Sequence, residues 1–333
     1  MILIKLSICI PTYNRAKFLN VCLDHLIPQI SGKDSVELIV IDNASNDNTP
    51  GIVKEFISKC TNIHYYRNDM NVGYSGNQTK CIEYSNGQYT AILSDDDVYT
   101  DNLVDDILNI IIKKEYSFIA LNYYSFFENV DKPHQANFAP TNDVTFDRAY
   151  DVMNYPSVGH FSGFVFNSVL AKKTLKEMLQ KHTIQEYEKY RGVISDIAHR
   201  SLSKTSIPSY FFGKRKLATR IPLEVDYDSI NHLCLDYYEY FLKLYDESMI
   251  NQADLDYRKK LVQSGLPRAI FVDAYKKNNV ELKIISDRLT IFFRKDIKFR
   301  CLIHSLLYLS KFSAIKYLFR YIHKIKRHFK YPH

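Results

Sequence analysis

The chain has 333 residues, of which 46% are hydrophobic and 24% are charged, a composition typical of a globular protein with one large domain or two smaller ones. No apolar run reaches the 18 uninterrupted residues that a membrane-spanning helix needs, which excludes an integral helical membrane protein. The six cysteines are scattered and lack closely spaced histidines, so a structural zinc site and a disulfide framework are disfavoured, and reduced thiols in a cytoplasmic protein are expected.

The first 100 residues alternate short apolar runs with helical patterns. The N-terminal MILIKLSICI predicts a strand and not a signal peptide, because Lys5 interrupts it and Pro11 ends it. Residues 16–30 then repeat apolar side chains at helical spacing. The same step recurs with predicted strands at 36–41, 63–66 and 89–93 and predicted helices at 52–57 and 77–84.

This order predicts an α/β fold, a parallel sheet wrapped by helices. In such sheets ligands bind beyond the carboxyl ends of the strands. Polar clusters follow the four predicted strands, at 11–15, 42–45, 67–73 and 95–97. We therefore expect these clusters to converge in space.

The last of these clusters is the acidic triplet Asp95, Asp96 and Asp97. Neighbouring carboxylates repel one another, so a fold that gathers them at a strand end is expected to supply a compensating cation. A competing interpretation is that Asp97 and Asp101 only provide negative charge near the N-terminus of the helix that follows. That interpretation explains one or two carboxylates and not three.

Four motifs together resemble the family 2 glycosyltransferases, which have the GT-A fold and bind nucleotide-diphospho-sugars. The motifs are SICIPTYNR at 7–15, VIDNASNDNT at 40–49, NVGYSGNQ at 71–78 and ILSDDD at 92–97. They stand in the family's order and spacing and cover about the first 100 residues. The resemblance extends to bacterial O-antigen sugar transferases of the abequosyltransferase type. It implies a Rossmann-like, mostly parallel sheet flanked by helices, and the residue patterns after Leu217 add a C-terminal helical extension.

The resemblance also implies which residues bind the donor nucleotide. Tyr13 would flank the base, Asp42 and Asn43 would meet the base or the ribose, and the glycine loop would let the backbone approach the donor. Turn and helix-start preferences explain most of these residues when each is taken alone. The donor-binding candidates are Pro11, Tyr13, Asp42, Asn43, Asn71, Gly73 and Asp95.

For the chemical step, the resemblance implies a divalent cation, Mg²⁺ or Mn²⁺, bound by Asp96, with Asp97 acting on the metal indirectly, behind Asp96 or through a water molecule. The position of Ser94 is more commonly acidic in the family. The catalytic base of inverting members is an acid about 100 residues later, which is matched here by Asp196, although Ser195 stands where the family usually has Glu. A simple helix cap is the competing role for Asp196.

The segment HFSGFVFNS at 160–168 matches the place where the family binds its acceptor. Aromatic faces pack well on sugar rings, so His160, Phe161 and Phe164 are acceptor-binding candidates. Packing in the core explains the two phenylalanines equally well.

The strand and helix alternation stops near Leu217, and helices are predicted around 233–245, 255–263 and 269–275. The chain carries a net charge of +7, yet residues 288–333 hold twelve basic residues against one acid, a sum of +11, and the preceding residues sum to −4. Residues 301–327 combine an apolar face with a basic one, which suits an anionic membrane surface. The competing interpretation is a helix that packs back on the body of the protein.

The expected domains are therefore a catalytic domain at 1–216, a helical region at 217–287 and a basic amphipathic membrane-associating tail at 288–333. The expected function is that of an inverting, hexosyl-type glycosyltransferase, peripheral to the cytoplasmic side of the inner membrane. It would transfer a sugar from a nucleotide-diphospho-sugar to a lipid-linked saccharide in O-antigen or surface polysaccharide biosynthesis.

Three alternatives stay open. A nucleotidylyltransferase usually begins with a Gly-rich loop, whereas the first strand here ends in PTYNR. An inactive membrane-bound scaffold is supported by Ser94 and Ser195 in usually acidic positions. Nucleic-acid binding is disfavoured, because the basic tail has an apolar face and the body is acidic.

Overall fold

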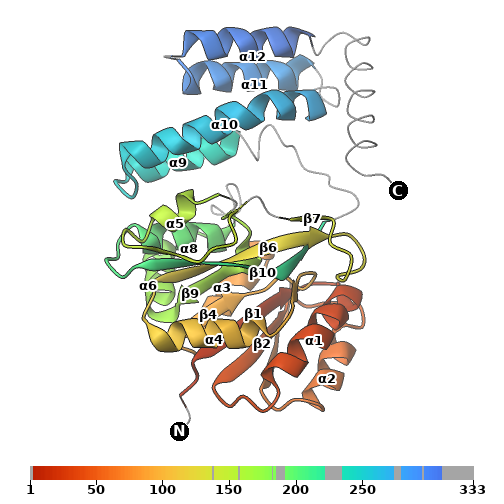
Figure 1. Ribbon diagram of the computed structural model, residues 1–333. Coiled ribbons are helices and arrows are strands. Elements are labelled where there is room, and N and C mark those ends of the chain that lie inside the picture. Colours follow the sequence, from red (N-terminus) through yellow and green to blue (C-terminus); the bar gives the residue numbers. More distant parts are fainter. Residues whose placement is uncertain are drawn as a thin grey trace. The chain divides into compact units, whose positions relative to one another are not determined.

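The computed structural model describes residues 3–136, 139–156, 158–181, 183–184, 192–221, 235–273, 279–294 and 296–309. It divides into two compact units, Met1–Glu224 and Val225–His333. The first unit contains the sheet and the second is helical (Figure 1). Strand β10 (Ser209–Arg220) crosses residue 216, where the sequence predicted the end of the catalytic domain.

The first unit begins with the predicted alternation of strands and helices. Strands β1 and β2 pair in parallel, β1 also pairs with β4, and β2 pairs with β3. The residues of β1 and β2 are almost entirely buried, which explains why apolar residues dominate both strands and do not alternate with exposed polar ones. The elements are β1 (Leu6–Thr12), α1 (Ala16–Ile30), β2 (Val36–Asp42), α2 (Thr49–Ile57), β3 (Ile63–Arg67), α3 (Tyr74–Tyr84) and β4 (Tyr89–Ile92).

Helix α3 begins earlier than predicted. Its first residue is Tyr74, directly after Gly73, which has a positive φ of 82°. Residues 75–79 are small or polar and nevertheless buried, so apolar periodicity could not reveal the first turn. The helix therefore starts inside the NVGYSGNQ motif and leaves only residues 71–73 as loop.

The remaining strands complete one mixed sheet. Within the described residues ten strands join it, in the order β3-β2-β1-β4-β9-β6-β10-β5, with β7 and β8 at the side. Strand β9 lies antiparallel between β4 and β6, and β6 is parallel to β10. The elements are β5 (Val98–Tyr99), α4 (Leu103–Lys113), β6 (Phe118–Phe126), β7 (Gln135–Ala136), β8 (Val144–Phe146), α5 (Asp151–Asn154), η1 (Phe161–Gly163), β9 (Phe164–Asn167), α6 (Ser168–Leu179) and α8 (Val193–Leu202).

Strands β1 to β4, β6 and β10 therefore run in one direction. Helix α1 packs against α2 and α4, and helices α3, α6 and α8 pack together, so that helices cover the sheet (Figure 1). The predicted fold class is confirmed: an α/β fold with a mostly parallel sheet flanked by helices and a helical C-terminal extension.

The strand order reverses beside β1. From β1 the chain moves outward to β2 and β3, and it then returns to place β4 on the other side of β1. Connections that leave β1 and β4 in opposite directions open a space at their carboxyl ends, where ligands bind in open α/β sheets. Residues 13–15 leave β1 and the acidic triplet follows β4, so both clusters lie at this point.

The second unit consists of helices α9 (Asp236–Asp246), α10 (Gln252–Asp273), α11 (Asn279–Phe292) and α12 (Ile297–Leu309). Helix α10 is continuous where the sequence predicted two helices, and Pro267 lies inside it. Proline removes a helical hydrogen bond, but Leu266 and Ile270 on either side are fully buried, and tertiary packing dominates helix stability.

Polar and aromatic contacts hold this unit together. The Arg288 guanidinium lies 2.8 Å from carboxylate oxygens of both Asp236 and Glu239, and the rings of Tyr238 and Phe293 stack. No helix of the described residues is long and apolar enough to cross a membrane. The predicted tail starts within α11, but most of it, residues 310–333, lies outside the described residues.

Candidate functional site

The acidic triplet occupies the loop after β4, and its three carboxylates have different surroundings. Asp95 is 2% exposed, accepts a hydrogen bond from the Thr12 hydroxyl at 2.7 Å and pairs with Arg15 at 3.1 Å. Asp96 is the most exposed of the three, with a side chain 17% exposed, and its Oδ2 lies 2.6 Å from Arg15. Its Oδ1 accepts a hydrogen bond from the Ser94 hydroxyl at 2.6 Å.

Asp97 is turned into the protein. Its Oδ2 accepts a hydrogen bond from the Ser162 hydroxyl at 2.6 Å and its Oδ1 from the backbone N–H of Arg220 at 2.8 Å. His160 Nδ1 lies 3.6 Å from the same carboxylate. Both oxygens are thus engaged inside the protein, and the indirect role of Asp97 at a metal stays a prediction.

Burial raises the affinity of Asp95 and Asp97 for protons. Burial raises the pKa of Asp95 to about 7, although Arg15 and the Thr12 hydroxyl act in the opposite direction. Burial also raises the pKa of Asp97, and His160 opposes that shift. A buried carboxylate is unfavourable in its charged form, so positive charge near the triplet favours the ionised state.

Two arginines that the sequence analysis left without a role supply that charge. The guanidinium groups of Arg15 and Arg220 both lie over the Phe18 ring, 5.0 and 5.1 Å from its centroid. Arg220 Nε donates a hydrogen bond to the Asp96 carbonyl at 3.3 Å, and Nη1 donates to the carbonyl of Phe127 at 2.6 Å. Arg15 belongs to the PTYNR motif, but Arg220 is 124 residues from Asp96, and no local signal could have found it.

The predicted donor residues after β2 and β3 form a polar network. Asn43 is 3% exposed. Its amide nitrogen donates to Asn71 Oδ1 at 2.8 Å and its oxygen accepts from Asn68 Nδ2 and from the Val72 backbone N–H at 2.9 Å. Asn68 also donates to Asn77 on α3 at 3.0 Å. The structure therefore brings Asn43 and Asn71 together, and their side chains fix the shape of the loop before α3.

Asp42 is fully buried at the end of β2. Its Oδ2 accepts a hydrogen bond from the Tyr65 hydroxyl at 2.6 Å and its Oδ1 from the Ser45 backbone N–H at 2.8 Å. Arg67 lies 3.8 Å from the same carboxylate and donates to the Ser45 carbonyl at 2.8 Å. Asp42 thus orders the turn after β2.

The other donor candidates lie where a ligand can reach them. Pro11 is partly exposed in β1, and Tyr13, directly after the strand, is 40% exposed. Gly73 accepts a hydrogen bond at its carbonyl from the Asn43 amide at 3.2 Å. The positive φ of Gly73 requires a residue without a Cβ, which explains the glycine at this position.

Asp196 lies in the first turn of α8 and is 4% exposed. Arg200, one turn further on, donates from Nε to its Oδ1 at 2.8 Å. Helix α8 begins after Gly192, which has a φ of 78°, and a Cβ at that glycine would lie 3.3 Å from the Tyr74 ring. The start of the helix that carries Asp196 therefore packs against the start of α3.

Tyr74 is the first residue of α3 and is more than half exposed. Its accessible ring therefore lies beside the start of the helix that carries Asp196.

The three predicted acceptor residues differ in position. The ring of His160 stacks on Phe161 at an angle of 11° and lies 5.5 Å from Tyr123, and both His160 and Phe161 are partly exposed. Phe164 is 1% exposed and packs against Phe118, with ring centroids 5.0 Å apart. Phe164 belongs to the core, because it lies inside β9, and its ring has no surface to offer an acceptor.

Comparison with known proteins assigns the family. The model of the family described as Glycosyl transferase family 2 matches residues 7–179, more than half of the chain. The chain belongs to this family. The predicted resemblance is therefore confirmed at the level of the family, and the abequosyltransferase type stays a prediction.

Curated relatives of family 2 are similar over part of their length. Glycosyltransferase GlyG of Streptococcus pneumoniae is 24% identical over 124 residues, which cover 37% of this chain and 40% of the relative. The minor teichoic acid biosynthesis protein GgaB of Bacillus subtilis is 26% identical and covers 52% of this chain and 19% of its own length. The UDP-Glc:alpha-D-GlcNAc-diphosphoundecaprenol beta-1,3-glucosyltransferase WfgD of Escherichia coli is 28% identical, and the match covers 35% of this chain and 45% of the relative.

The matches thus span about two fifths of the length of the first of these relatives.

Solved structures extend the likeness of the fold. Staphylococcus aureus TarS 1–349 in complex with UDP-GlcNAc aligns with a TM-score of 0.64 and 15% identity over 99% of this chain and 93% of its own. The mannosyltransferase PcManGT of Pyrobaculum calidifontis, in complex with GDP-Man and Mn²⁺, aligns with a TM-score of 0.54 and 12% identity over 93% and 87%.

Carboxylates at this site could hold a divalent cation. Over the described part of the chain, no three or more His, Cys, Asp and Glu side chains form a metal-binding cluster. Mg²⁺ sites, however, commonly use one or two carboxylates together with substrate phosphates and water. Asp96 fits that pattern, because it is the most exposed carboxylate of the triplet and offers hard oxygen ligands.

Proposed function

We propose that this protein is a glycosyltransferase that transfers one sugar from a nucleotide-diphospho-sugar to an acceptor hydroxyl. The observation that carries the proposal is the convergence of the acidic triplet and the PTYNR motif at the carboxyl ends of β4 and β1, where the strand order reverses. Thr12 and Arg15 contact Asp95 directly, so these clusters form one site and are not separate turns. Family membership supports the same reaction class.

Each part of this reaction is assigned to different residues of the site. We assign the base and ribose to Tyr13 and the ordered turns at Asp42 and Asn71, and the divalent cation to Asp96. A cation held there would neutralise charge that develops on the departing nucleoside diphosphate. Asp196 would accept the proton of the acceptor hydroxyl, which implies inversion at the sugar carbon by analogy with the family.

Related proteins support a class of donor and acceptor. TarS was solved with UDP-GlcNAc, WfgD is named for UDP-Glc and a diphosphoundecaprenol-linked acceptor, and GgaB for teichoic acid biosynthesis. We therefore propose a lipid-linked saccharide as the acceptor and a role in the assembly of a surface polysaccharide, such as O-antigen. UDP is the first nucleotide to test.

We expect one of UDP, CDP, GDP and dTDP to bind the full-length protein only when Mn²⁺ or Mg²⁺ is present. The measurement is calorimetric titration together with a thermal-unfolding scan for each nucleotide, with and without metal. A nucleotide at a hundred times its dissociation constant should stabilise the folded protein by about 2.7 kcal/mol. If all four nucleotides fail to bind folded protein, the donor site is wrong and an inactive scaffold becomes the better interpretation.

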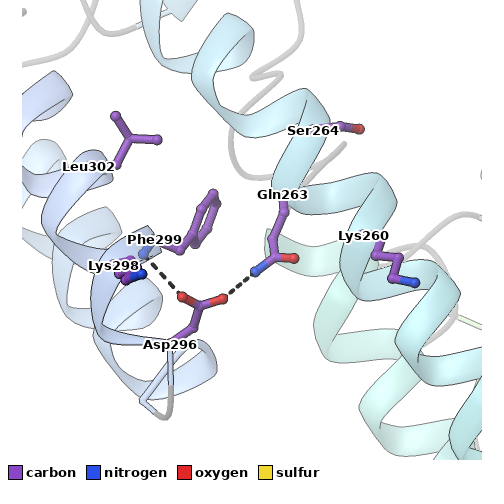
Figure 2. A pocket seen from close by; sticks show the side chains of 7 residues that line it. All are labelled: Lys260, Gln263, Ser264, Asp296, Lys298, Phe299 and Leu302. Carbon is purple, nitrogen blue, oxygen red and sulfur yellow. Dashed lines mark hydrogen bonds between the residues drawn. The ribbon is translucent and has the colours of Figure 1, made fainter.

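We also propose that the protein is peripheral to the cytoplasmic face of the inner membrane. Exposed apolar and basic side chains of the helical unit support contact with a membrane surface. Helix α12 exposes Ile297 by 69% and Leu302 by 49%. Figure 2 shows a groove between α10 and α12, in which Asp296 accepts hydrogen bonds from Gln263 at 2.7 Å and from the Phe299 backbone at 3.1 Å. The residues that line the groove are Lys260, Gln263, Ser264, Asp296, Lys298, Phe299 and Leu302. Apolar and basic side chains side by side suit an anionic lipid surface.

We expect the full-length protein to float with vesicles that contain phosphatidylglycerol and not with vesicles of phosphatidylcholine alone. Each basic residue near an anionic surface contributes roughly 1 kcal/mol to membrane binding. Salt screens this attraction, so about 0.5 M NaCl should release the protein from the vesicles. The double variant I297D/L302D should bind less, whereas Ile112→Asp, which changes a 66% exposed residue on α4, should bind normally. Equal flotation of both variants would place the membrane contact elsewhere.

A further inference from the structure

Arg15 spans two carboxylates of the acidic triplet. Its Nη1 lies 3.1 Å from Asp95 Oδ1, and its Nη2 lies 2.6 Å from Asp96 Oδ2. The side chain is 40% exposed and rests on the Phe18 ring. Arginine presents its donors in a planar fork that matches carboxylate and phosphate oxygens equally well. Arg15 is therefore suited to exchange one kind of anionic partner for the other.

Arg15 contacts an oxygen of Asp96, the carboxylate of the triplet that a cation would reach most easily. Asp95 and Asp97 have side chains only 3% and 2% exposed, against 17% for Asp96. The other oxygen of Asp96 accepts the Ser94 hydroxyl. A divalent cation that approaches the most accessible carboxylate therefore meets the guanidinium of Arg15, and two positive groups cannot share that oxygen without strong repulsion.

Arg220 also lies beside the triplet, but its contacts fix it in place. Its guanidinium donates to the carbonyls of Asp96 and Phe127, and it lies 4.5 Å over the Phe126 ring. The partners that the structure gives to the Arg15 guanidinium are the carboxylates and the Phe18 ring. Arg15 can thus leave Asp96 without breaking a backbone contact, and Arg220 cannot.

We propose that Arg15 and the divalent cation compete for Asp96, and that the diphosphate of the donor resolves this competition by offering Arg15 a new anionic partner. The inference rests on the proposed function and adds that binding of the cation depends on binding of the nucleotide. The cation binds weakly alone and well together with a nucleoside diphosphate. Because coupling between two ligands is reciprocal, each then strengthens the binding of the other.

The test is a pair of calorimetric titrations of Mn²⁺ into full-length protein, the first without nucleotide and the second with each of UDP, CDP, GDP and dTDP at saturation. Arg15→Ala should bind Mn²⁺ alone about tenfold more tightly than the wild type. A saturating nucleotide should tighten Mn²⁺ binding by a factor that is about ten times smaller in Arg15→Ala than in the wild type. A tenfold change is an ordinary size for the coupling between two ligands. A residue that only stabilises the fold would weaken both kinds of binding.

Two further variants complete the design. Lys17→Ala removes an exposed positive charge two residues away and should match the wild type in both titrations. Arg15→Lys keeps the charge without the fork, so its Mn²⁺ affinity should lie between those of the wild type and Arg15→Ala. Arg15→Ala leaves the carboxylates without their partner and could therefore fail to fold. If circular dichroism shows that it does not fold, Arg15→Lys replaces it in the test.

The outcomes separate this inference from the proposed function. Mn²⁺ affinity without nucleotide that is unchanged or weaker in Arg15→Ala and in Arg15→Lys would overturn the competition, even if the wild type binds a nucleotide. Tighter Mn²⁺ binding by the variants, combined with no nucleotide effect on the wild type, would refute the donor site and with it the role of the diphosphate. Tighter Mn²⁺ binding with a reduced nucleotide effect supports the whole inference.

Discussion

Replacement of Asp196 by asparagine is expected to lower the rate of sugar transfer by about 10²–10⁴-fold, the usual contribution of a general base. Asparagine keeps the shape of the side chain and cannot accept the proton of the acceptor hydroxyl. Binding of the donor nucleotide should persist, because the predicted donor residues lie on other elements of the sheet edge. The measurement is kcat with a saturating donor, together with the dissociation constant of the nucleotide.

The alternative for Asp196 is a structural role as the partner of Arg200, 2.8 Å away. Removal of one partner of a buried ion pair destabilises a protein by about 3–5 kcal/mol, so a structural role would lower the unfolding temperature and leave the kcat of the folded fraction intact. Glu177→Gln provides a matched control, since it neutralises an exposed carboxylate that pairs with Lys204 at 2.7 Å. Transfer by folded Asp196→Asn at the wild-type rate would exclude Asp196 as the base.

Asp96→Ala is expected to abolish metal-dependent nucleotide binding and to lower transfer by about a thousandfold or more. A cation that stabilises charge on a leaving group contributes several kcal/mol, and each 1.36 kcal/mol corresponds to a factor of ten in rate. The fold should survive, because the Asp96 side chain is partly exposed and Arg15 retains Asp95 as a partner. The measurements are Mn²⁺-dependent nucleotide binding and initial rates over a range of Mn²⁺ concentrations.

Asp101→Asn provides the control for this variant. Asp101 is an exposed acid in the turn before α4 with a positive φ of 49°, a conformation that asparagine also tolerates. It should leave the nucleotide affinity and the rate unchanged. Metal-dependent binding that persists in Asp96→Ala would shift the cation to another ligand and would remove the chemical argument for Asp96.

The fold could be predicted as far as local patterns determine it. Buried parallel strands are short apolar runs, and each run here ends in polar residues, so the first four strands and their common edge were visible. Strand β9 was not, because its place between β4 and β6 joins residues more than 40 positions apart in the sequence. Hydrophobic periodicity carries no information about which strands become neighbours.

The site shows the same division at the level of single residues. The motifs located Asp95, Asp96 and Asp97, but a run of identical residues does not reveal that Asp97 turns inward to Ser162 while Asp96 is the most exposed. An aromatic ring beside a glycine predicts an acceptor contact for Phe164, and only the place of β9 between β4 and β6 shows that this ring lies in the core. The role of Arg220 depends on a contact across 124 residues, which no local motif can encode.

The loop before α3 is fixed by the side-chain amides of Asn43, Asn68, Asn71 and Asn77. Amide groups do not titrate in the ordinary pH range and carry no net charge for salt to screen. The contacts of these amides with one another should therefore be the same in acidic and neutral buffers, and the one charged group that joins them among the described residues is Lys80, which donates from Nζ to Asn68 Oδ1 at 2.5 Å. Any change of ligand affinity with pH or salt would then report on the charged groups around the triplet, and the amide loop would serve as a constant frame against which that change is measured.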